Sequence, residues 1–250
     1  MTTIPLQTTT RPASLIARPA WPVRRPPAAI GLPRPIEREW ECGRRVLNVI
    51  VAALGLVLAA PIILIIAALV KLSSPGPVIY RQTRVGLDRR LRHPSDGMRR
   101  RADTGGRPFT IYKFRTMSVQ EGAGGAEVWA SPADPRVTRV GRIFRQYRLD
   151  ELPQLWNVLI GDMNVVGPRP EQPRIVADLR KQVGNYALRQ QVRPGITGWA
   201  QINHHYDSSV DDVRRKVSLD LEYIERQSLM ADLWIMVRTV PVVMFKYGAW

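Results

Sequence analysis

The 250-residue chain contains little cysteine and little histidine. Its single cysteine, Cys42, excludes a disulfide framework within the chain, and its three histidines have no companion cysteines with which to bind zinc. The glycine-rich signatures of P-loop and Rossmann nucleotide sites are also absent from the sequence, so neither of these loops holds a nucleotide. The function therefore depends on something other than disulfides, a zinc site or one of these two nucleotide-binding loops.

Acidic residues are scarce as well. Lys and Arg total 37 against 21 Asp and Glu, a formal net charge of +16, and the first acid is Glu37. This charge requires an anionic partner, and nucleic acid and anionic membrane lipid both qualify on charge alone. Residues 1–38 are rich in Pro and Arg and show no apolar period, which predicts a basic disordered tail. A transit peptide is the alternative for this segment.

One long apolar run follows the tail. Residues 46–70 are interrupted only by Asn48, Gly55 and Pro61, and about 25 apolar residues suffice to cross a hydrocarbon core. Basic residues flank the run on both sides and give no clear orientation. Pro61 lies near the middle and favours a bend. We predict a membrane helix over residues 39–72, either straight and spanning or bent and re-entrant.

The strongest chemical pattern surrounds Asp150 and Glu151. Proline is tolerated in a first helical turn, so Pro153 predicts a helix that begins near Asp150, and Gly161 is expected to end it. An acid pair at a helix N-terminus is by itself typical of capping. Apolar residues at steps of three and four predict an inward-facing stripe made of Leu152, Leu155, Trp156 and Leu159.

The arginines around this helix indicate more than capping. Arg148 precedes the acid pair, and Arg169 lies in a rigid Gly-Pro-Arg-Pro turn just after the helix. Guanidinium groups suit phosphate oxygens, and free N–H groups at a helix N-terminus attract phosphate too. The pattern therefore indicates a phosphate-binding acid site.

The remaining residues, 73–250, are expected to form one α+β domain that is mainly helical. Residues 78–82 and 109–115 read as two strands that pair as a small β-hairpin, with Lys113 and Arg115 on one face toward the acid pair. The basic loop between the strands, 88–108, is either a solvated loop or a contact for lipid headgroups. A polar helix is expected over residues 172–184.

The C-terminal segment is apolar. Aromatic residues and cations in residues 229–250 suit an amphipathic element at the headgroup boundary, and Pro241 is expected to interrupt it. Such apolar terminal segments also permit a homodimer.

An ordered set of motifs gives the chain a family resemblance. From about residue 44 to the C-terminus it resembles the bacterial sugar transferases, monotopic phosphoglycosyltransferases that act on polyprenyl phosphate. The matching stretches are Lys113-Phe114-Arg115-Thr116-Met117, Leu149-Asp150-Glu151-Leu152-Pro153-Gln154-Leu155-Trp156-Asn157-Val158, Gly161-Asp162-Met163, Val166-Gly167-Pro168-Arg169-Pro170-Glu171 and Arg193-Pro194-Gly195-Ile196-Thr197-Gly198-Trp199-Ala200-Gln201.

The resemblance implies transfer of a sugar-1-phosphate from a UDP-sugar to polyprenyl (undecaprenyl) phosphate. UMP is released, and the step begins the synthesis of an exopolysaccharide, lipopolysaccharide or related glycan. Asp150 would attack the β-phosphorus and form a covalent phospho-sugar intermediate, and Glu151 would bind Mg²⁺. The groups expected to hold phosphate are Lys113, Arg115, Arg148 and Arg169, with Asp220 as a supporting acid.

The resemblance also implies a topology. The helix would fold back at Ala60 and Pro61, so that the catalytic domain, with interfacial amphipathic helices, faces the cytoplasm at the bacterial inner membrane. The chain departs from the family where Asn48 replaces an acid and Ala60 replaces a serine, which is expected to weaken the polar contacts that hold the bend.

A different class of function fits part of the sequence. A basic, membrane-anchored protein that binds nucleic acid or acidic lipid without chemistry would have the same charge and apolar run. An Asp-Glu pair between arginines disfavours polyanion binding, so the enzyme, with no nucleic-acid partner, is the reading we adopt. The sequence carries no code for which sugar is transferred.

Overall fold

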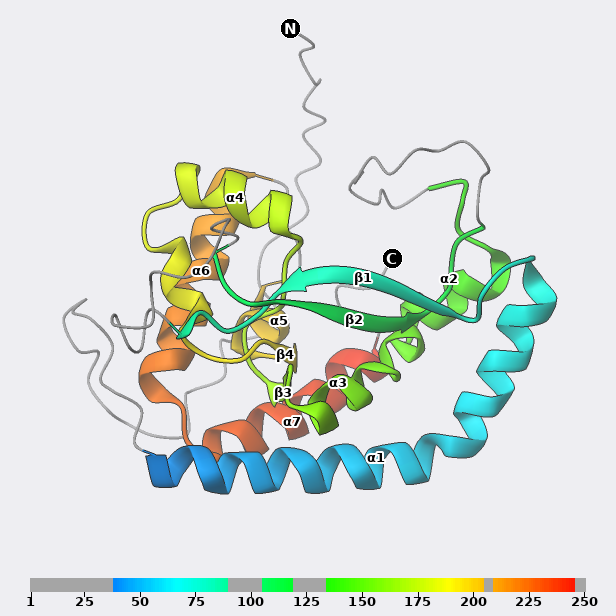
Figure 1. Cartoon of the computed structure of the whole chain (residues 1–250), viewed down its shortest axis with the longest axis horizontal. Coiled ribbons are helices and arrows are strands. Elements are labelled where there is room, and N and C mark those ends of the chain that lie inside the picture. The colour runs from blue at the N-terminus through cyan, green and yellow to red at the C-terminus, as the bar shows by residue number, and fades with distance from the viewer. Residues whose placement is uncertain (1–37, 90–104, 119–133, 205–208, 246–250) are drawn as a thin grey trace, which may run out of the picture.

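The computed structural model describes residues 38–89, 105–118, 134–204 and 209–245. Helices and two short sheets make up this part of the chain (Figure 1), which confirms the predicted α+β, mainly helical class with its β-hairpin. The expected tail and most of the basic loop lie outside the described residues. In chain order the elements are α1 (Arg38–Ser73), β1 (Ile79–Val85), β2 (Pro108–Phe114), α2 (Arg139–Gln146), η3 (Leu149–Glu151), α3 (Gln154–Ile160), β3 (Asn164–Val166), α4 (Pro173–Gln182), η4 (Tyr186–Gln191), β4 (Gly195–Thr197), α5 (Trp199–Asn203), α6 (Val210–Arg226) and α7 (Leu229–Met244).

Helix α1 is continuous over 36 residues, close to the bounds that the apolar run predicts. By length and composition alone it is long enough and apolar enough to cross a membrane. Figure 1 shows it running along the lower side of the molecule and then turning steeply in its second half. Pro61 lies inside the helix and accounts for a bend, because proline lacks the N–H of the helical hydrogen bond. Exposed apolar side chains along it include Val57, Leu58 and Leu64.

Polar side chains fix the N-terminal half of α1 to the rest of the fold. Arg44 donates to the Asp232 carboxylate on α7 at 2.7 Å and to the Val166 carbonyl at the end of β3 at 2.9 Å. Asn48 donates to the Arg44 carbonyl and accepts from the Val165 N–H. Asn48 therefore makes polar contacts of its own, because its amide supplies both a donor and an acceptor where a carboxylate supplies acceptors only. The expectation that it weakens the contacts that hold the bend stays a prediction.

The hairpin aligns the cationic strand with the central helix. β1 and β2 pair antiparallel, from Ile79 opposite Phe114 to Val85 opposite Pro108. Phe109, Ile111 and Phe114 of β2 are buried, and the first two belong to a different hydrophobic cluster from the third. The predicted pairing is thus confirmed, with the first strand longer than the sequence pattern suggests.

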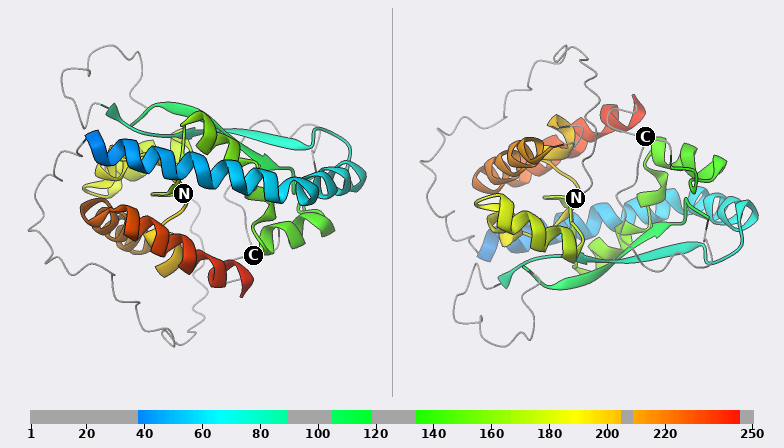
Figure 2. Two further views of the ribbon diagram at one scale, coloured as in Figure 1. Left: turned by 90° about the horizontal axis from the view of Figure 1, so that it is seen from below. Right: turned by 90° about the horizontal axis from the view of Figure 1, so that it is seen from above.

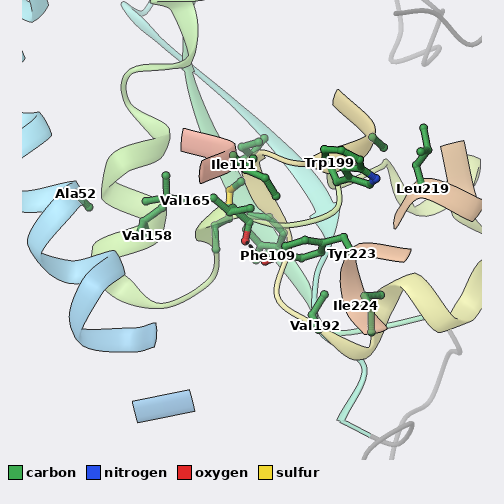
Figure 3. Close-up of a cluster of buried hydrophobic side chains, with 14 residues drawn as sticks. Ala52, Phe109, Ile111, Val158, Val165, Val192, Trp199, Leu219, Tyr223 and Ile224 are labelled. Carbon is green, nitrogen blue, oxygen red and sulfur yellow. Dashed lines mark hydrogen bonds between the residues drawn. The ribbon is translucent and has the colours of Figure 1, made fainter. Parts of the chain in front are cut away.

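The core lies between α1, the hairpin, α3 and α6. Figure 3 shows the cluster, to which Ala52 contributes from α1, Val158 from α3, Val165 from β3 and Tyr223 from α6. β3 pairs in parallel with β4, with Asn164 opposite Gly195 and Val166 opposite Thr197, a pairing that no local pattern predicts. This small sheet joins the turn that carries Arg169 to the segment around residues 193–198.

Helix α7 shares the lower side of the molecule with α1, as Figure 2 shows from below. The prediction that Pro241 interrupts the C-terminal segment is wrong: α7 continues through it to Met244. Pro241 stands near the helix end, where the loss of one N–H donor is a small disturbance. Ala231 and Ile235 are buried, whereas Met230 and Val237 are exposed, so the outer face of the helix is apolar.

Candidate active site

The acid pair precedes the central helix. Asp150 and Glu151 lie in the 3₁₀ turn η3, and α3 begins at Gln154, so the prediction that the helix begins near Asp150 is wrong by one turn. Leu152 (φ −52°, ψ −38°) and Pro153 (φ −61°, ψ −15°) keep right-handed dihedral angles, so the chain winds continuously from the acid pair into the helix. The predicted end at Gly161, with φ 88°, is confirmed.

The buried side of α3 carries two polar residues beside the apolar Val158. Gln154 and Asn157 are buried, whereas Trp156, which the spacing places in an inward apolar stripe, is 53% exposed. Asn157 explains the orientation, because its Oδ1 accepts from the Tyr112 N–H at 3.1 Å and its Nδ2 donates to the Thr110 carbonyl at 2.7 Å. These bonds satisfy backbone groups on β2 that would otherwise be buried without partners.

Glu151 is held between two cations. Its Oε1 accepts from Lys113 Nζ at 2.9 Å and from Arg169 Nη2 at 2.7 Å. Burial alone would raise the pKa of the Glu151 carboxyl, but Arg169 and Lys113 outweigh it and hold that pKa well below its usual range. Glu151 is therefore ionised across the physiological range of pH.

Asp150 has the opposite environment. Its side chain is 8% exposed, and it makes no hydrogen bond or ion pair with any residue that the structure describes. Burial raises the pKa of the Asp150 carboxyl to about 6, against the opposing charge of Lys113. A buried carboxylate without donors keeps its lone pairs for a reacting partner.

Two arginines flank this carboxylate. Arg148 adopts φ 52°, a left-handed conformation that is uncommon for a residue with a Cβ. Burial and the nearby Arg169 lower the pKa of its guanidinium. Arg145, which the sequence patterns do not single out, donates from Nε to Thr116 Oγ1 at 2.9 Å and lies close enough to act on the charge of Asp150.

The Gly-Pro-Arg-Pro turn aims Arg169 at Glu151. Gly167 donates to the Thr197 carbonyl at 2.8 Å, and a Cβ on Gly167 would lie 2.5 Å from the Arg193 carbonyl, so the tight crossing requires glycine. Arg169 Nη1 also donates to Gln201 Oε1 at 3.0 Å. The β3–β4 pairing thus brings together Arg169 and Gln201, which belong to two different motifs of the sequence.

Asp220 does not reach the acid pair. Only 2% exposed, it accepts from Arg189 Nε at 2.9 Å, and Arg189 Nη2 donates to the Arg169 carbonyl at 3.1 Å. The role of Asp220 as a supporting acid for phosphate binding stays a prediction. Its effect on the site passes through Arg189, which supports the backbone of the Arg169 turn.

Comparisons with known proteins identify the family of this chain. A family model described as bacterial sugar transferase matches residues 40–246. The chain belongs to the bacterial sugar transferase family. A UDP-glucose:undecaprenyl-phosphate glucose-1-phosphate transferase from Caulobacter vibrioides is 44% identical over 200 residues, which cover 79% of this chain and 68% of that protein.

Two further relatives of this sugar transferase are longer. A UDP-N-acetylgalactosamine-undecaprenyl-phosphate N-acetylgalactosaminephosphotransferase from Aeromonas hydrophila is 41% identical over 206 residues, 82% of this chain and 44% of the relative. A UDP-glucose:undecaprenyl-phosphate glucose-1-phosphate transferase from Escherichia coli is 42% identical over 199 residues, 79% of this chain and 39% of the relative. The chain therefore spans less than half the length of these two proteins.

Arg115 of this sugar transferase lies away from the acid pair. Its Nη2 donates to the Val70 carbonyl at 3.2 Å and to the Ser74 carbonyl at 2.6 Å, at the C-terminal end of α1. The strand ends at Phe114, so the alternation that predicts a shared face for Lys113 and Arg115 no longer applies. The expectation that Arg115 faces the acid pair is therefore wrong, and its hydrogen bonds fasten the membrane helix to β2.

The acid pair offers carboxylate oxygens of the kind that Mg²⁺ prefers as ligands. Within the described ranges no group of three or more His, Cys, Asp or Glu side chains could hold a metal ion. Mg²⁺ needs only one or two carboxylates when a diphosphate supplies the other oxygens. In Glu151, Oε1 carries the two short bonds to Lys113 and Arg169, and Oε2 has one long contact of 3.5 Å, again with Arg169. The donor set therefore fits the ion.

Proposed function

We propose that this protein transfers a sugar-1-phosphate from a UDP-sugar to undecaprenyl phosphate and releases UMP. The observation that carries the proposal is the contrast within the acid pair: Asp150 has no hydrogen-bond partner among the described residues, while Glu151 is held by Lys113 and Arg169. Capping would not leave a buried carboxylate without donors. The names of the relatives support the same reaction class. The alternative, a binding protein without chemistry, has no support among them.

The reaction proceeds in two displacements at phosphorus. An Asp150 oxygen bonds to the β-phosphorus of the UDP-sugar, the bond from that phosphorus to the bridging oxygen breaks, and UMP leaves with the oxygen and its electron pair. An oxygen of undecaprenyl phosphate then attacks the same phosphorus, and the bond to Asp150 breaks. No proton has to move in either displacement, so the work of the site is positioning and charge neutralisation.

The cations of the site suit this task. Arg148 lies near both carboxylates and makes no hydrogen bond through its side chain with any described residue, so its donors are available to diphosphate oxygens. Lys113 and Arg169 hold Glu151 ionised. Glu151 would hold Mg²⁺ together with the diphosphate, and the ion would neutralise charge on the donor.

We further propose that α1 is re-entrant and that the domain faces the cytoplasm at the bacterial inner membrane. The bend of α1 in Figure 1 and the apolar outer faces of α1 and α7 on one side of the molecule support a helix that dips into one leaflet beside an interfacial helix. A spanning helix is the competing arrangement.

The activity is tested with detergent-solubilised protein, Mg²⁺, undecaprenyl phosphate and a panel of UDP-sugars that begins with UDP-glucose and UDP-N-acetylgalactosamine. We expect UMP from one donor, a mass increase of one phospho-sugar in the absence of lipid, and loss of both in Asp150→Asn. UMP formation that strictly requires the lipid, with no adduct, would contradict the covalent intermediate. No turnover by folded protein with any donor would contradict the transferase.

Topology is tested with a membrane-impermeant maleimide on inverted and right-side-out vesicles. The natural Cys42 is exposed and reports on the N-terminal end of α1, and Leu72→Cys in a Cys42→Ser background reports on the C-terminal end. Labelling of both positions from the cytoplasmic side fits a re-entrant helix. Labelling from opposite sides would establish a spanning helix.

A further inference from the structure

Gln154, three residues after Glu151, has a buried side chain to which the proposed reaction assigns no role. Gln154 is 2% exposed, and its Nε2 has no hydrogen-bond partner in the part of the chain that the structure describes. Burying an amide without its hydrogen bonds lowers stability, because the bonds it makes to water are lost and not replaced. A leucine or methionine would fill the same space without that cost, so the amide requires an explanation.

The winding of the chain places this amide on the same side as the nucleophile. The backbone is right-handed from η3 into α3, so Asp150, Gln154 and Asn157 recur at steps of four and three on one buried face. Asn157 uses its whole amide on the backbone of β2. In the same row, the buried Gln154 Nε2 has no hydrogen-bond partner among the described residues, and none of the described residues donates a hydrogen bond to the Asp150 carboxylate.

A phosphoryl group would satisfy both the Asp150 carboxylate and the Gln154 amide. A phosphoryl group bonded to Asp150 carries negative oxygens next to the carboxylate, and an amide N–H₂ one helical turn away is a neutral donor for such an oxygen. Burial strengthens the interaction, since water does not compete for the donor. A neutral donor also binds phosphate without adding to the charge that already surrounds Glu151.

We propose that Gln154 Nε2 donates a hydrogen bond to a non-bridging oxygen of the phosphoryl group as it passes onto and off Asp150. This inference rests on the proposed function and deepens it. It makes Gln154 a substrate-contacting catalytic residue whose donor is satisfied only when the phosphoryl group is in place, which accounts for its unpaired state in the free protein.

The decisive variant is Gln154→Met, which keeps the length of the side chain and removes the donor. We expect the rate of phospho-sugar adduct formation and the turnover to fall on the order of 100-fold, as for the loss of one preorganised donor to a transition-state oxyanion. We also expect the melting temperature to stay level or rise, because an unsatisfied buried amide is lost. The fall in kcat should exceed any change in KM for the UDP-sugar.

Gln190→Met is the matched control. Gln190 is 7% exposed and also carries a buried amide atom without a partner, Oε1, but it lies in η4. We expect the same thermal behaviour with turnover within twofold of wild type. Gln154→Leu is tested beside Gln154→Met, because it removes the same donor and adds no charge.

The outcomes separate the two proposals. A wild-type protein that forms no adduct and no UMP with any donor fails the transferase itself. An active wild type together with a Gln154→Met variant of near-normal rate overturns the role of Gln154. A Gln154→Met variant that loses stability and activity in parallel also overturns it, because the amide would then be structural.

Discussion

Asp150 and Glu151 are neighbours in the chain and are buried to a similar degree, yet their carboxylates meet opposite surroundings. Glu151 accepts short bonds from Lys113 and Arg169, while the Asp150 carboxylate accepts none from the described residues. The difference arises because successive residues of a 3₁₀ turn point in different directions. Glu151 is therefore fixed and ionised, whereas the Asp150 carboxylate is not held by hydrogen bonds from the described residues.

Neutralising these two acids should change stability in opposite directions. Asp150→Asn removes a buried charge without partners and should raise the free energy of unfolding at pH 8 by about 2 kcal/mol, while abolishing adduct formation. Glu151→Gln leaves Lys113 and Arg169 unpaired and should lower it by on the order of 2 kcal/mol. Chemical denaturation of both variants in one detergent checks the signs. Equal losses in both would contradict the assigned environments.

The Asp150 variant also gives a pH test with a definite sign. The folded-state pKa, about 6, lies above the ordinary value of 3.8, so the folded protein binds this proton more tightly than the unfolded chain. Wild-type stability therefore declines relative to Asp150→Asn as pH rises from about 4 to 6, and the gap is constant above that window. Unfolding titrations from pH 4 to 8 measure it; a gap that closes toward pH 8 would exclude a raised pKa.

The rate of the first half-reaction should follow the same group. Only the ionised carboxylate is a nucleophile, so adduct formation should fall as pH drops through about 6, approaching tenfold per pH unit below it. Bound Mg²⁺ favours the ionised form and should move the midpoint to lower pH. Single-turnover mass spectrometry at several Mg²⁺ concentrations tests this, and a midpoint that rises with Mg²⁺ would contradict it.

Replacing Arg148 should affect stability and activity in different ways. Its φ of 52° costs a residue with a Cβ on the order of 1 kcal/mol, which glycine does not bear. Arg148→Gly should therefore melt at the wild-type temperature or above it and lose most of its transfer activity. Arg148→Lys, with the strain kept and one cation retained, is the control and should be less impaired in activity. A glycine variant of normal activity would remove Arg148 from the phosphate site.

The ion pair between Arg44 on α1 and Asp232 on α7 should contribute strongly to the free energy of unfolding. Arg44 and Asp232 are 6% and 0% exposed, and their side chains are 2.7 Å apart. Asp232→Asn should lower the free energy of unfolding by about 3 kcal/mol because it leaves a buried guanidinium without its counter-charge. Arg44→Met combined with Asp232→Leu should lose less than the sum of the single variants. Strict additivity of the two changes would contradict the coupling.

Local patterns in the sequence determined much of this protein. The apolar run predicts α1, strand alternation predicts the β1–β2 pairing, and Gly161 predicts the end of α3. Each of these depends on neighbouring residues and backbone preferences alone. The motifs also single out the acid pair, Lys113, Arg148 and Arg169, which the structure brings together. Their role in binding phosphate stays a prediction.

Only the tertiary structure decided which polar groups meet. The parallel pairing of β3 with β4 brings Arg169 to Gln201, and Asn157 turns the polar face of α3 toward β2, which leaves Trp156 exposed. Arg115 and Asp220 carry suitable charges, but the chain directs one to the end of α1 and the other to Arg189. Charge and spacing do not encode these partners, because they depend on contacts between residues distant in the chain.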